Sequence, residues 1–480
     1  MKLKINWSTK KIALLIFAAF FSFETFAQWS AGINLSPNAR AAGLNESMGS
    51  CIGVSGDTVH IVWGDRFNTT HGAIYYIRSV DDGLSWSTPV AITDTNGNAW
   101  NAAIAVNGQN IHVVWREIDT LNNHRSSHYK HSLDGGITWG TNMTIDSAVA
   151  DWPAVAVSGN NVYVANDIVT SAAPYNTEIF FLRSTDNGMN WSAHTQVTFA
   201  SGRSEDEAIT AEGAHVFMSW NDNRSGQMQI FYKHSGDYGV TWDADVIVIP
   251  PFGYGTMVSA DSASIDVVAA GTPSGRYQIL LAQSPDTGIT WSADTNLTRD
   301  TANTYYYPDM ARDGNNLHVT YVKSATGAQY LHSADGGATW DSPYTFCNSG
   351  ITPFIAYSEC TLHVIVPDSG HINYFRNPTG NSGQHCLTVE GASNQLSEKF
   401  NVKVYPNPFA SQTTIEILSS DKHENCELKI YDLYGRNVSN LNFGNKNKII
   451  LGKKTLSNGI YFYKINEREK TIAEGKIIIE

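Results

Sequence analysis

Lysine is scarce in the body of this 480-residue chain. Between residues 28 and 400 it occurs only at Lys130, Lys233, Lys323 and Lys399. The whole chain has a formal charge of −13 and its two ends, 1–27 and 401–480, carry +3 each, so the body carries −19. A nucleic-acid binder needs a basic surface, and the composition therefore excludes that class. The acidic body also opposes general attraction to polyanions.

Cysteine is rare as well, with five residues in the chain. This number is too small for a disulfide scaffold, although Cys347 and Cys360 are close enough in sequence to pair. No C-x-x-C pair and no His/Cys spacing indicates zinc, so we expect neither a metal nor a cofactor. A chain of this length can bury a large core without such cross-links.

Long apolar runs are missing after residue 23. Before it, residues 1–27 combine Lys2, Lys4, Lys10 and Lys11 with the apolar run Ile12–Phe23 and the small-residue end Thr25-Phe26-Ala27. This pattern is typical of a secretory signal. A membrane anchor is disfavoured, because the run is well short of the roughly 20 residues that span a bilayer. We expect an exported mature protein without a transmembrane segment.

One phrase, S-x-D-x-G-x-[STN]-W, occurs six times at intervals of 49 to 53 residues. The copies are Ser79–Trp86, Ser132–Trp139, Ser184–Trp191, Ser235–Trp242, Ser284–Trp291 and Ser333–Trp340. The Asp can accept hydrogen bonds within a tight turn, the Gly permits a positive φ, and the Trp is a large apolar side chain. Six near-identical copies indicate one structural part used repeatedly. We assign this structural role to Asp81, Asp134, Asp186, Asp237, Asp286 and Asp335.

The phrase resembles the Asp-box, or BNR, repeat of sialidase-like β-propellers. The resemblance implies that each turn joins the third and fourth strands of a blade, on the face away from the active site. A unit of about 50 residues with four short strands is also typical of a propeller blade. The expected fold class is therefore all-β.

The strand pattern predicts a seven-bladed propeller over residues 28–378, whereas sialidases of this superfamily have six blades. After the sixth turn, Ile351–Tyr357, Thr361–Val366 and His371–Asn377 form three strands of a blade that lacks its fourth. The segment Trp29–Ser36 resembles the fourth strands of other repeats, so we expect it to pair with His371–Asn377. Such closure removes the open edges that invite aggregation.

The last 80 residues have a different pattern. Strands of alternating polarity around VYPNPF (Val404–Phe409) and LKIYDLYGRNV (Leu428–Val438) predict a small β-sandwich at 400–480, after a linker at 379–399. Their order and wording resemble the C-terminal sorting domain of the Bacteroidetes type IX secretion system. The resemblance implies that the secretion machinery is a partner, and that the protein is secreted or displayed at the cell surface. The alternative is an ordinary accessory β-module.

The face opposite the Asp-box turns is where we expect a ligand. We predict a mouth formed by Trp100, Trp152, Arg203, Asp206 and Tyr307. Trp152, Asp206 and Tyr307 occupy one slot of different repeats with different chemistries, as a binding site requires. Aromatic rings stack on sugar faces, and arginine and acids bind hydroxyls. The alternative is that these are ordinary loop residues.

Three functions fit the sequence. The first is non-catalytic binding of an extracellular glycan or protein, and the second is a sialidase-like glycoside hydrolase. The third is a purely structural surface or adhesion protein. A sialidase needs three arginines, a Tyr nucleophile with its Glu, and an Asp, and also an F/Y-R-I/L-P motif. The nearest string, Phe375-Arg376-Asn377-Pro378, aligns with strand ends that precede an Asp-box turn, so we assign no catalytic residue.

Three other groups have simpler explanations. The histidines His60, His112, His318 and His363 share one strand position in different repeats, so we expect them to lie apart. The segment Asp94–Asn98 faintly resembles the start of a calcium loop, but the loop needs Gly at its sixth position and Glu at its twelfth, where this sequence has Ala99 and Ala105. Glu205–Glu207 is interpreted as a solvated acidic loop, with a cation site as the alternative.

Overall fold

The computed structural model describes two stretches of the chain. The first is 29–378, except 45–48, 67–70, 120, 123, 149, 173, 174, 251, 252, 274, 325 and 359. The second is 401–479, except 408, 419–425, 432–436, 445, 454, 455, 468 and 469. The predicted signal (1–27) and linker (379–399) lie outside the described residues.

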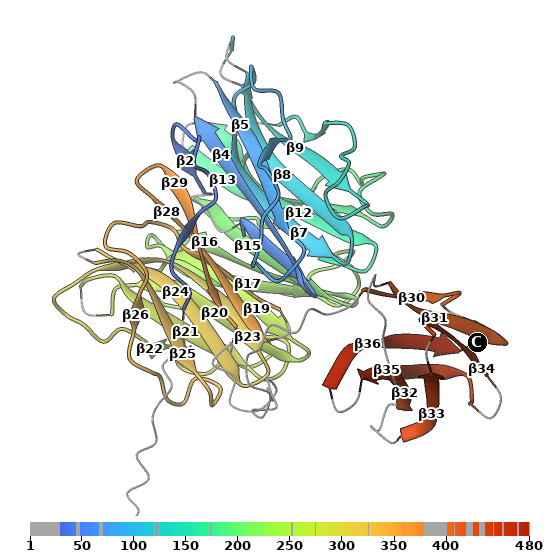
Figure 1. The fold of residues 1–480 in the computed structure, drawn as a ribbon. Helices are drawn as coiled ribbons and strands as arrows, with labels where there is room; N and C mark the ends of the chain where they lie inside the picture. Colours follow the sequence, from blue (N-terminus) through green and yellow to red (C-terminus); the bar gives the residue numbers. More distant parts are fainter. Residues whose placement is uncertain are drawn as a thin grey trace, which may run out of the picture. The chain divides into compact units, whose positions relative to one another are not determined.

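The regular structure of the described residues consists of β-strands, and none of it is a helix that could cross a membrane. Contacts divide the chain into two units, Met1–Cys386 and Leu387–Glu480 (Figure 1). Within the described residues, the first unit has seven antiparallel sheets, which we number 1 to 7 in chain order. Sheet 1 holds five strands and the others hold four.

The strands of the first three sheets are as follows. Sheet 1 contains β2 (Ala42–Gly43), β3 (Ile52–Ser55), β4 (Thr58–Arg66), β5 (Gly72–Ser79) and β6 (Val90–Ala91). Sheet 2 contains β7 (Ala99–Asn107), β8 (Asn110–Asp119), β9 (His124–Ser132) and β10 (Met143–Asp146). Sheet 3 contains β11 (Ala150–Ser158), β12 (Asn161–Ala172), β13 (Tyr175–Ser184) and β14 (Thr195–Gln196).

The next four sheets follow the same order. Sheet 4 contains β15 (Ser204–Glu212), β16 (His215–Asp222), β17 (Gln229–Ser235) and β18 (Val246–Ile249). Sheet 5 contains β19 (Tyr254–Asp261), β20 (Ser264–Gly271), β21 (Gln278–Ser284) and β22 (Thr295–Asn296). Sheet 6 contains β23 (Tyr305–Asp313), β24 (Asn316–Lys323), β25 (Gly327–Ser333) and β26 (Tyr344–Thr345). Sheet 7 contains β27 (Phe354–Ser358), β28 (Thr361–Asp368), β29 (His371–Asn377) and β1 (Ile33–Asn34).

Sheet 7 joins the two ends of the first unit. Ile33 of β1 lies opposite Tyr374 of β29 in an antiparallel pair. Leu35 N donates to Ile372 O at 2.8 Å, which extends the pairing beyond the strand. The N-terminal segment therefore pairs with His371–Asn377, as the sequence predicts.

The sheets follow one another in a cycle. The strands β3, β7, β11, β15, β19, β23 and β27 contact each other in that order, and β27 contacts β3 again. The strand that follows each of these in its sheet is buried on both faces. In β24, for example, seven of the eight residues are buried. A strand that is covered on both sides needs a near-continuous apolar run, and the LHVTYV wording of β24 supplies it.

Neighbouring sheets are joined by an edge-on aromatic pair. The Trp of an Asp-box turn meets a Tyr or Phe on the third strand of the preceding sheet, with ring centroids 4.7 to 5.1 Å apart. These pairs are Tyr374–Trp86, Tyr76–Trp139, Tyr129–Trp191, Phe181–Trp242 and Tyr232–Trp291. Trp29 meets Tyr330 in the same way at 5.0 Å. Each such pair adds about 0.5–1.5 kcal/mol beyond its buried area.

The Asp-box turns are held by their own side chains. Asp134 Oδ1 accepts from Thr138 N at 2.9 Å, and its Oδ2 accepts from Thr138 Oγ1 at 2.6 Å. These bonds, that of the Thr138 side chain first, lower the pKa of Asp134 to about 2. Gly136 has a φ of 81°, and a Cβ there would lie 1.9 Å from Tyr76 Oη. The equivalent backbone bond to the carboxylate recurs in the other five turns.

The four repeated histidines lie in separate sheets. Their Nδ1 atoms stand 2.7 to 2.8 Å from tyrosine hydroxyls in the pairs His60–Tyr76, His112–Tyr129, His318–Tyr330 and His363–Tyr374. Burial, followed by the charge of Arg78, lowers the pKa of His60 to about 4. The shared strand position, with its hydrogen bond to a tyrosine, therefore accounts for the four repeated histidines.

The structure decides a cysteine pairing that the sequence left open. Cys347 is free, whereas Cys360 is in a disulfide. Cys347 and Cys360 are therefore not bonded to each other. A disulfide needs a specific separation of the two Cβ atoms, which nearness in sequence does not provide.

The second unit has two small sheets. One contains β30 (Asn401–Tyr405), β31 (Gln412–Leu418) and β34 (Lys448–Gly452). The other contains β32 (Cys426–Tyr431), β33 (Asn437–Gly444), β35 (Gly459–Glu467) and β36 (Lys470–Ile479). Alternate residues of β32 are buried, and Leu428 and Ile430 lie in a core with Ile415 and Ile465.

Candidate ligand-binding site

The first strands of five sheets carry a bulge at the same point. The pairing register shifts in β7, β11, β15, β19 and β23. One residue of each bulge has a positive φ: Asn101 (51°), Trp152 (39°), Asp206 (55°), Gly255 (60°) and Tyr307 (50°). A bulky residue with positive φ is an outlier. Such strain persists where the surroundings enforce it, and it clusters at functional sites.

Three of the five predicted ligand residues, Trp152, Asp206 and Tyr307, occupy this bulge position. They belong to sheets 3, 4 and 6. Tyr254 of sheet 5 links the last two, because both Asp206 and Tyr307 contribute to raising its pKa, after burial. The structure thus brings Asp206, Tyr254 and Tyr307 to one region.

The other two predicted residues lie differently. The Trp100 ring packs between sheets 1 and 2, where a Cβ on Gly72 would stand 2.5 Å from Trp100 Cζ2. The Arg66 guanidinium lies 4.1 Å from the centroid of the same ring. Arg203 is 41% exposed and its Nη1 stands 3.4 Å from Glu205 Oε1. Trp100 is therefore a packing residue at the interface of sheets 1 and 2, and Arg203 lies at the rim of the site.

Five acidic residues of sheets 3 and 4 form an acidic cluster: Asp151, Asp167, Glu205, Asp206 and Glu207. Asp151 and Asp167 are direct cross-strand partners on β11 and β12. The two carboxylate oxygens of Asp151 bind Arg116 and Arg125 of sheet 2. These two arginines are thereby committed to a protein carboxylate.

Two members of the acidic cluster are buried and have carboxyl oxygens without a hydrogen-bond partner among the described residues. Asp167 is 4% exposed and Glu207 is 1% exposed. Asp167 Oδ1 and both carboxyl oxygens of Glu207 have no hydrogen-bond partner among the described residues. Burial, and then neighbouring carboxylates, raise the pKa of both groups well above the usual range. An unpaired buried charge costs several kcal/mol, so burial favours the neutral, protonated form of these carboxyls.

The segment Glu205–Glu207 is not the solvated loop that its sequence indicated. It lies in β15, and Asp206 is only 6% exposed, because the bulge turns these side chains inward. Asn221 Nδ2 donates to Asp206 Oδ2 at 2.8 Å, and Asn221 Oδ1 accepts from Gly255 N at 3.1 Å. Burial, followed by the charge of Glu205, raises the pKa of Asp206 to about 7.

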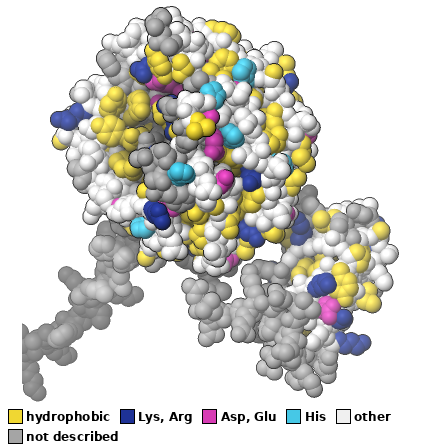
Figure 2. Space-filling view, turned by 90° about the horizontal axis from the view of Figure 1, so that it is seen from above, with side chains coloured by type: hydrophobic (Ala, Val, Ile, Leu, Met, Phe, Trp, Pro, Cys, Tyr) yellow, Lys and Arg dark blue, Asp and Glu magenta, His cyan; other side chains and the backbone are white. Residues whose placement is uncertain are grey.

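Two tyrosines line the rim of the acidic cluster. Tyr175 is 54% exposed and Tyr254 is 39% exposed. The pKa of Tyr175 is raised by burial and then by the charges of Asp167 and Glu205, which places it near the cluster. Figure 2 shows acidic side chains gathered near the middle of one face of the molecule, with Lys and Arg scattered around it.

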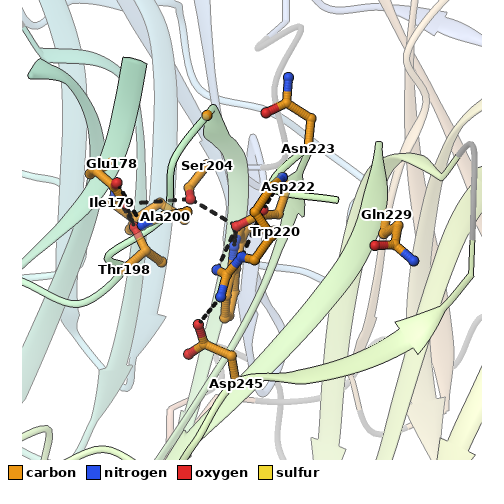
Figure 3. A network of polar contacts seen from close by, with 12 residues as sticks. Glu178, Ile179, Thr198, Ala200, Ser204, Trp220, Asp222, Asn223, Gln229 and Asp245 are labelled. Atoms are coloured by element: carbon orange, nitrogen blue, oxygen red, sulfur yellow. Dashed lines mark hydrogen bonds and ion pairs between the residues drawn. The ribbon is translucent and has the colours of Figure 1, made fainter. Parts of the chain in front are cut away.

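A polar network fixes the chain just before the bulge of sheet 4 (Figure 3). Ser204 Oγ donates to Asp222 Oδ2 at 2.9 Å and approaches Glu178 Oε2 of sheet 3 at 3.5 Å. Arg224 Nη2 donates to Asp222 Oδ2 at 2.6 Å, and Arg224 Nη1 donates to Asp245 Oδ2 at 2.7 Å. The start of β15 is thus tied to both sheets that border the acidic cluster.

The ligand set predicted from the sequence did not include Asp151, Asp167, Tyr175 or Tyr254. The burial of Glu207 was also missed. A signal was present in the residue after the bulge position, which in the five sheets is Ala102, Pro153, Glu207, Thr256 and Pro308. A carboxylic acid side chain at a position that otherwise holds small, uncharged residues indicates a role beyond maintaining the fold.

The remaining candidates do not join the site. Arg376 Nε donates to Asp82 O at 2.6 Å, in the first Asp-box turn, as its repeat position predicts. Among the described residues, no group of three or more His, Cys, Asp or Glu is arranged to hold a metal ion. The site therefore offers aromatic rings, buried carboxyls whose pKa values are raised, and arginines that are already paired.

Two families match the chain. Residues 14–319 match the BNR repeat-like domain, and residues 403–480 match the secretion system C-terminal sorting domain. The sorting domain indicates export to an outer-membrane, cell-surface or secreted location. No protein of curated function matches the sequence.

Several solved structures are similar to this chain at low identity. The chain is similar to an ulvan lyase of a new polysaccharide lyase family, with 11% identity, 72% of this chain and 95% of that chain covered, and a TM-score of 0.50. A sialidase of Trypanosoma rangeli has 10% identity, coverage of 72% and 59%, and a TM-score of 0.39. A protein of unknown function from Dyadobacter fermentans has 14% identity, coverage of 58% and 95%, and a TM-score of 0.43. The BNR match spans more than half of the sequence, and the chain therefore belongs to the BNR repeat-like family.

Proposed function

We propose that the protein is an exported seven-bladed β-propeller that binds an extracellular glycan without cleaving it. The cyclic contacts of the first strands and the pairing of β1 with β29 support the propeller. The observation that carries the function is the shared bulge position of Trp152, Asp206 and Tyr307. Its strained backbone is repeated while its side chain changes, whereas the Asp-box turns repeat their Asp, Gly and Trp side chains together with the backbone.

The chemistry of the rim favours a sugar. Tyr175 and Tyr254 present partly exposed rings, and Trp152 and Tyr307 are half-buried beside the same strands. Ring faces stack on the apolar faces of sugars, and a few placed polar groups then fix the orientation. The named activities of two structurally similar proteins, a sialidase and an ulvan lyase, also concern glycans.

One observation favours a second candidate, a sialidase-like glycoside hydrolase. The raised pKa values of Asp167 and Glu207 favour the protonated form that a general acid requires. A general acid must contact the glycosidic oxygen, however, and Glu207 is 1% exposed. Binding is therefore the better-supported function. Release of a fluorophore from sialosides or other aryl glycosides, lost in the Glu207→Gln variant, would establish the hydrolase instead.

A glycan array with the full-length protein tests the binding proposal. We expect retention of one glycan class, and at least a tenfold loss in a Trp152→Ala/Tyr307→Ala variant. The matched control is Asp237→Ala, which alters an Asp-box turn and should leave binding unchanged. Retention by Trp152→Ala/Tyr307→Ala together with loss in Asp237→Ala would contradict the proposed site. If the array gives no signal and the protein captures one extracellular protein instead, the ligand is a protein and not a glycan.

We also propose how the chain is divided for export. Residues 1–27 act as the signal, 28–378 form the propeller, 379–399 the linker, and 400–480 a β-sandwich recognised by the type IX machinery. Fusion of residues 395–480 to a periplasmic reporter in a type IX-competent host tests this division. The reporter should reach the surface or the medium, and its retention in the periplasm would refute the proposal.

A further inference from the structure

The contact between sheets 5 and 6 lacks the aromatic pair found at the others. Leu281 stands three residues before the Ser of its Asp-box turn, the position of Tyr232 in sheet 4. A Cβ on Gly288 would lie 2.2 Å from the Tyr232 ring, whereas a Cβ on Gly337 would lie 3.4 Å from Leu281 Cδ2. Trp340, the Trp of the sixth turn, therefore has an aliphatic neighbour where the other turns have an aromatic ring.

A cavity of about 610 Å³ lies at this contact, and we call it the side cavity. Sheet 5 lines it with Leu297 and Arg299, and sheet 6 lines it with Lys323, Leu331 and Trp340. Its volume is within the roughly 300–1,000 Å³ of small-molecule sites. Leu297, Leu331 and Trp340 pack in the same apolar cluster as the leucine of sheet 5 that replaces the ring. The missing ring and the side cavity are therefore parts of one local change.

At two other contacts a lysine fills the corresponding space. Lys130 Nζ donates to Ile92 O of the preceding sheet at 2.7 Å, and Lys233 Nζ donates to Val197 O at 2.5 Å. Leu331 occupies the repeat position of these lysines, two residues before the Ser of the Asp-box turn. Its shorter side chain leaves the space open toward solvent.

The charges around the side cavity are balanced. Lys323 Nζ stands 3.6 Å from Asp300 Oδ2, and Asp341 Oδ2 stands 2.8 Å from His332 Nδ1. With Arg299, this makes two permanent cations and two carboxylates. No surplus charge is present to hold an anionic group. Paired charged groups beside an aromatic ring can instead donate to and accept from hydroxyls.

We propose that the side cavity is a second carbohydrate site, in which a neutral sugar ring packs on Trp340 and its hydroxyls bind Lys323 and Asp341. This site is separate from the bulge positions and does not depend on the function proposed for them. Its ligand class is a neutral oligosaccharide, because the charges in and around the cavity balance once the pairing of Lys323 with Asp300 is included, and the lining combines aromatic rings with polar groups of both signs.

Binding of cellohexaose, laminarihexaose and hexa-N-acetylchitohexaose to the full-length protein, measured by calorimetry, tests the proposal. We expect at least one of them to bind and trigalacturonate to bind at least tenfold more weakly. Leu331→Lys should reduce the affinity for the neutral sugar at least tenfold, since the lysine would occupy the space as Lys130 does. Leu281→Tyr, which restores the missing ring beside Trp340, is expected to weaken binding as well.

Two controls keep the result interpretable. Trp291→Ala removes the equivalent Trp of the fifth turn, so it should lower stability without changing the affinity for the neutral sugar. Trp152→Ala/Tyr307→Ala should likewise leave this binding intact. The proposal is overturned by unchanged affinity in Leu331→Lys, by equal loss in Trp291→Ala, or by loss in Trp152→Ala/Tyr307→Ala. Failure of all three neutral sugars to bind would also overturn it.

Discussion

The Asp-box turns and the bulges use one repeated backbone in opposite ways. Each Asp-box turn keeps the same Asp, Gly and Trp, and the bonds of Asp134 recur in all six copies. Each bulge keeps the backbone and changes the side chain, from Trp152 to Asp206 to Tyr307. Identical copies carry stability, since each joins two sheets. Positions that vary on a constant backbone are free to carry recognition.

The largest expected effect tests whether the scaffold depends on its closing strand. Deletion of residues 28–37 removes β1 and the Trp29 ring that meets Tyr330 and Phe346. Loss of a buried Trp alone costs about 3–5 kcal/mol, so we expect the melting temperature to fall by at least about 10 °C, or the unit not to fold. Ile33→Thr, at a residue that is 40% exposed, is the control and should change little. Unchanged melting of the deletion variant would show that β1 is dispensable.

The second prediction separates backbone strain from packing in the Asp-box turns. Gly136→Ala puts a Cβ 1.9 Å from Tyr76 Oη at a φ of 81°. Gly108→Ala is the matched control, with a φ of 61° and no atom within 4 Å of its Cβ. We expect a loss of about 3 kcal/mol or more for Gly136→Ala, and about 1–2 kcal/mol for Gly108→Ala, in denaturant unfolding. Equal losses would mean that the contact with Tyr76 contributes nothing.

The third prediction compares an aspartate of each region by its pH dependence. The folded pKa of Asp206, about 7, is above its unfolded value, so its contribution to stability is present below about pH 4 and is lost as the pH rises through 7. Asp206→Asn should flatten the stability profile between pH 4 and 7, by up to about 4 kcal/mol. Asp134, with a pKa of about 2, contributes above about pH 4 and loses this contribution only as the pH falls toward 2. Asp134→Asn should therefore leave the slope between pH 4 and 7 unchanged, and a parallel change in both variants would contradict the assignment.

The smallest effect concerns the arginines that hold Asp151. Arg125 is 39% exposed and Arg116 is 14% exposed. Exposed ion pairs contribute about 0.2–1 kcal/mol, so Arg125→Ala should lower stability by less than about 1 kcal/mol. Arg116→Ala leaves Asp151 with one weaker partner in a more buried place and should cost more. Thermal melting at low and high salt measures which variant loses more stability. A larger loss for Arg125→Ala than for Arg116→Ala would contradict this prediction.

The repeat made much of the fold predictable. The Asp-box motif repeats every 49 to 53 residues, so the position of each turn could be derived from the spacing. The pairing of Trp29–Ser36 could be derived from its similarity to the fourth strands of other repeats and from the missing fourth strand of the last one. The bulge position of Trp152, Asp206 and Tyr307 was visible as a varying slot for the same reason.

The unpredicted features depend on contacts between different sheets. Whether Glu207 is solvated or buried is decided by how sheet 4 packs beside Asp167 of sheet 3. Trp100 packs at the interface of sheets 1 and 2 because Gly72 of sheet 1 leaves space for its ring. Neither relation is encoded within one repeat. The free thiol of Cys347 is a similar case, since distance along the chain does not set the direction of a Cβ atom.

The pairing of β1 with β29 has a consequence for when the chain can fold. The bond between Ser36 O and His371 Nδ1 joins residues 335 positions apart. Sheet 7 cannot be completed until the last of its strands has been synthesised, and contacts of such long range form slowly. The export proposed above would benefit from this delay, because a chain that is threaded through a translocation pore has to be unfolded. Trp29 also packs against sheet 6, so removal of the proposed signal would have to stop before this residue; trimming farther into the chain would remove the strand that completes sheet 7.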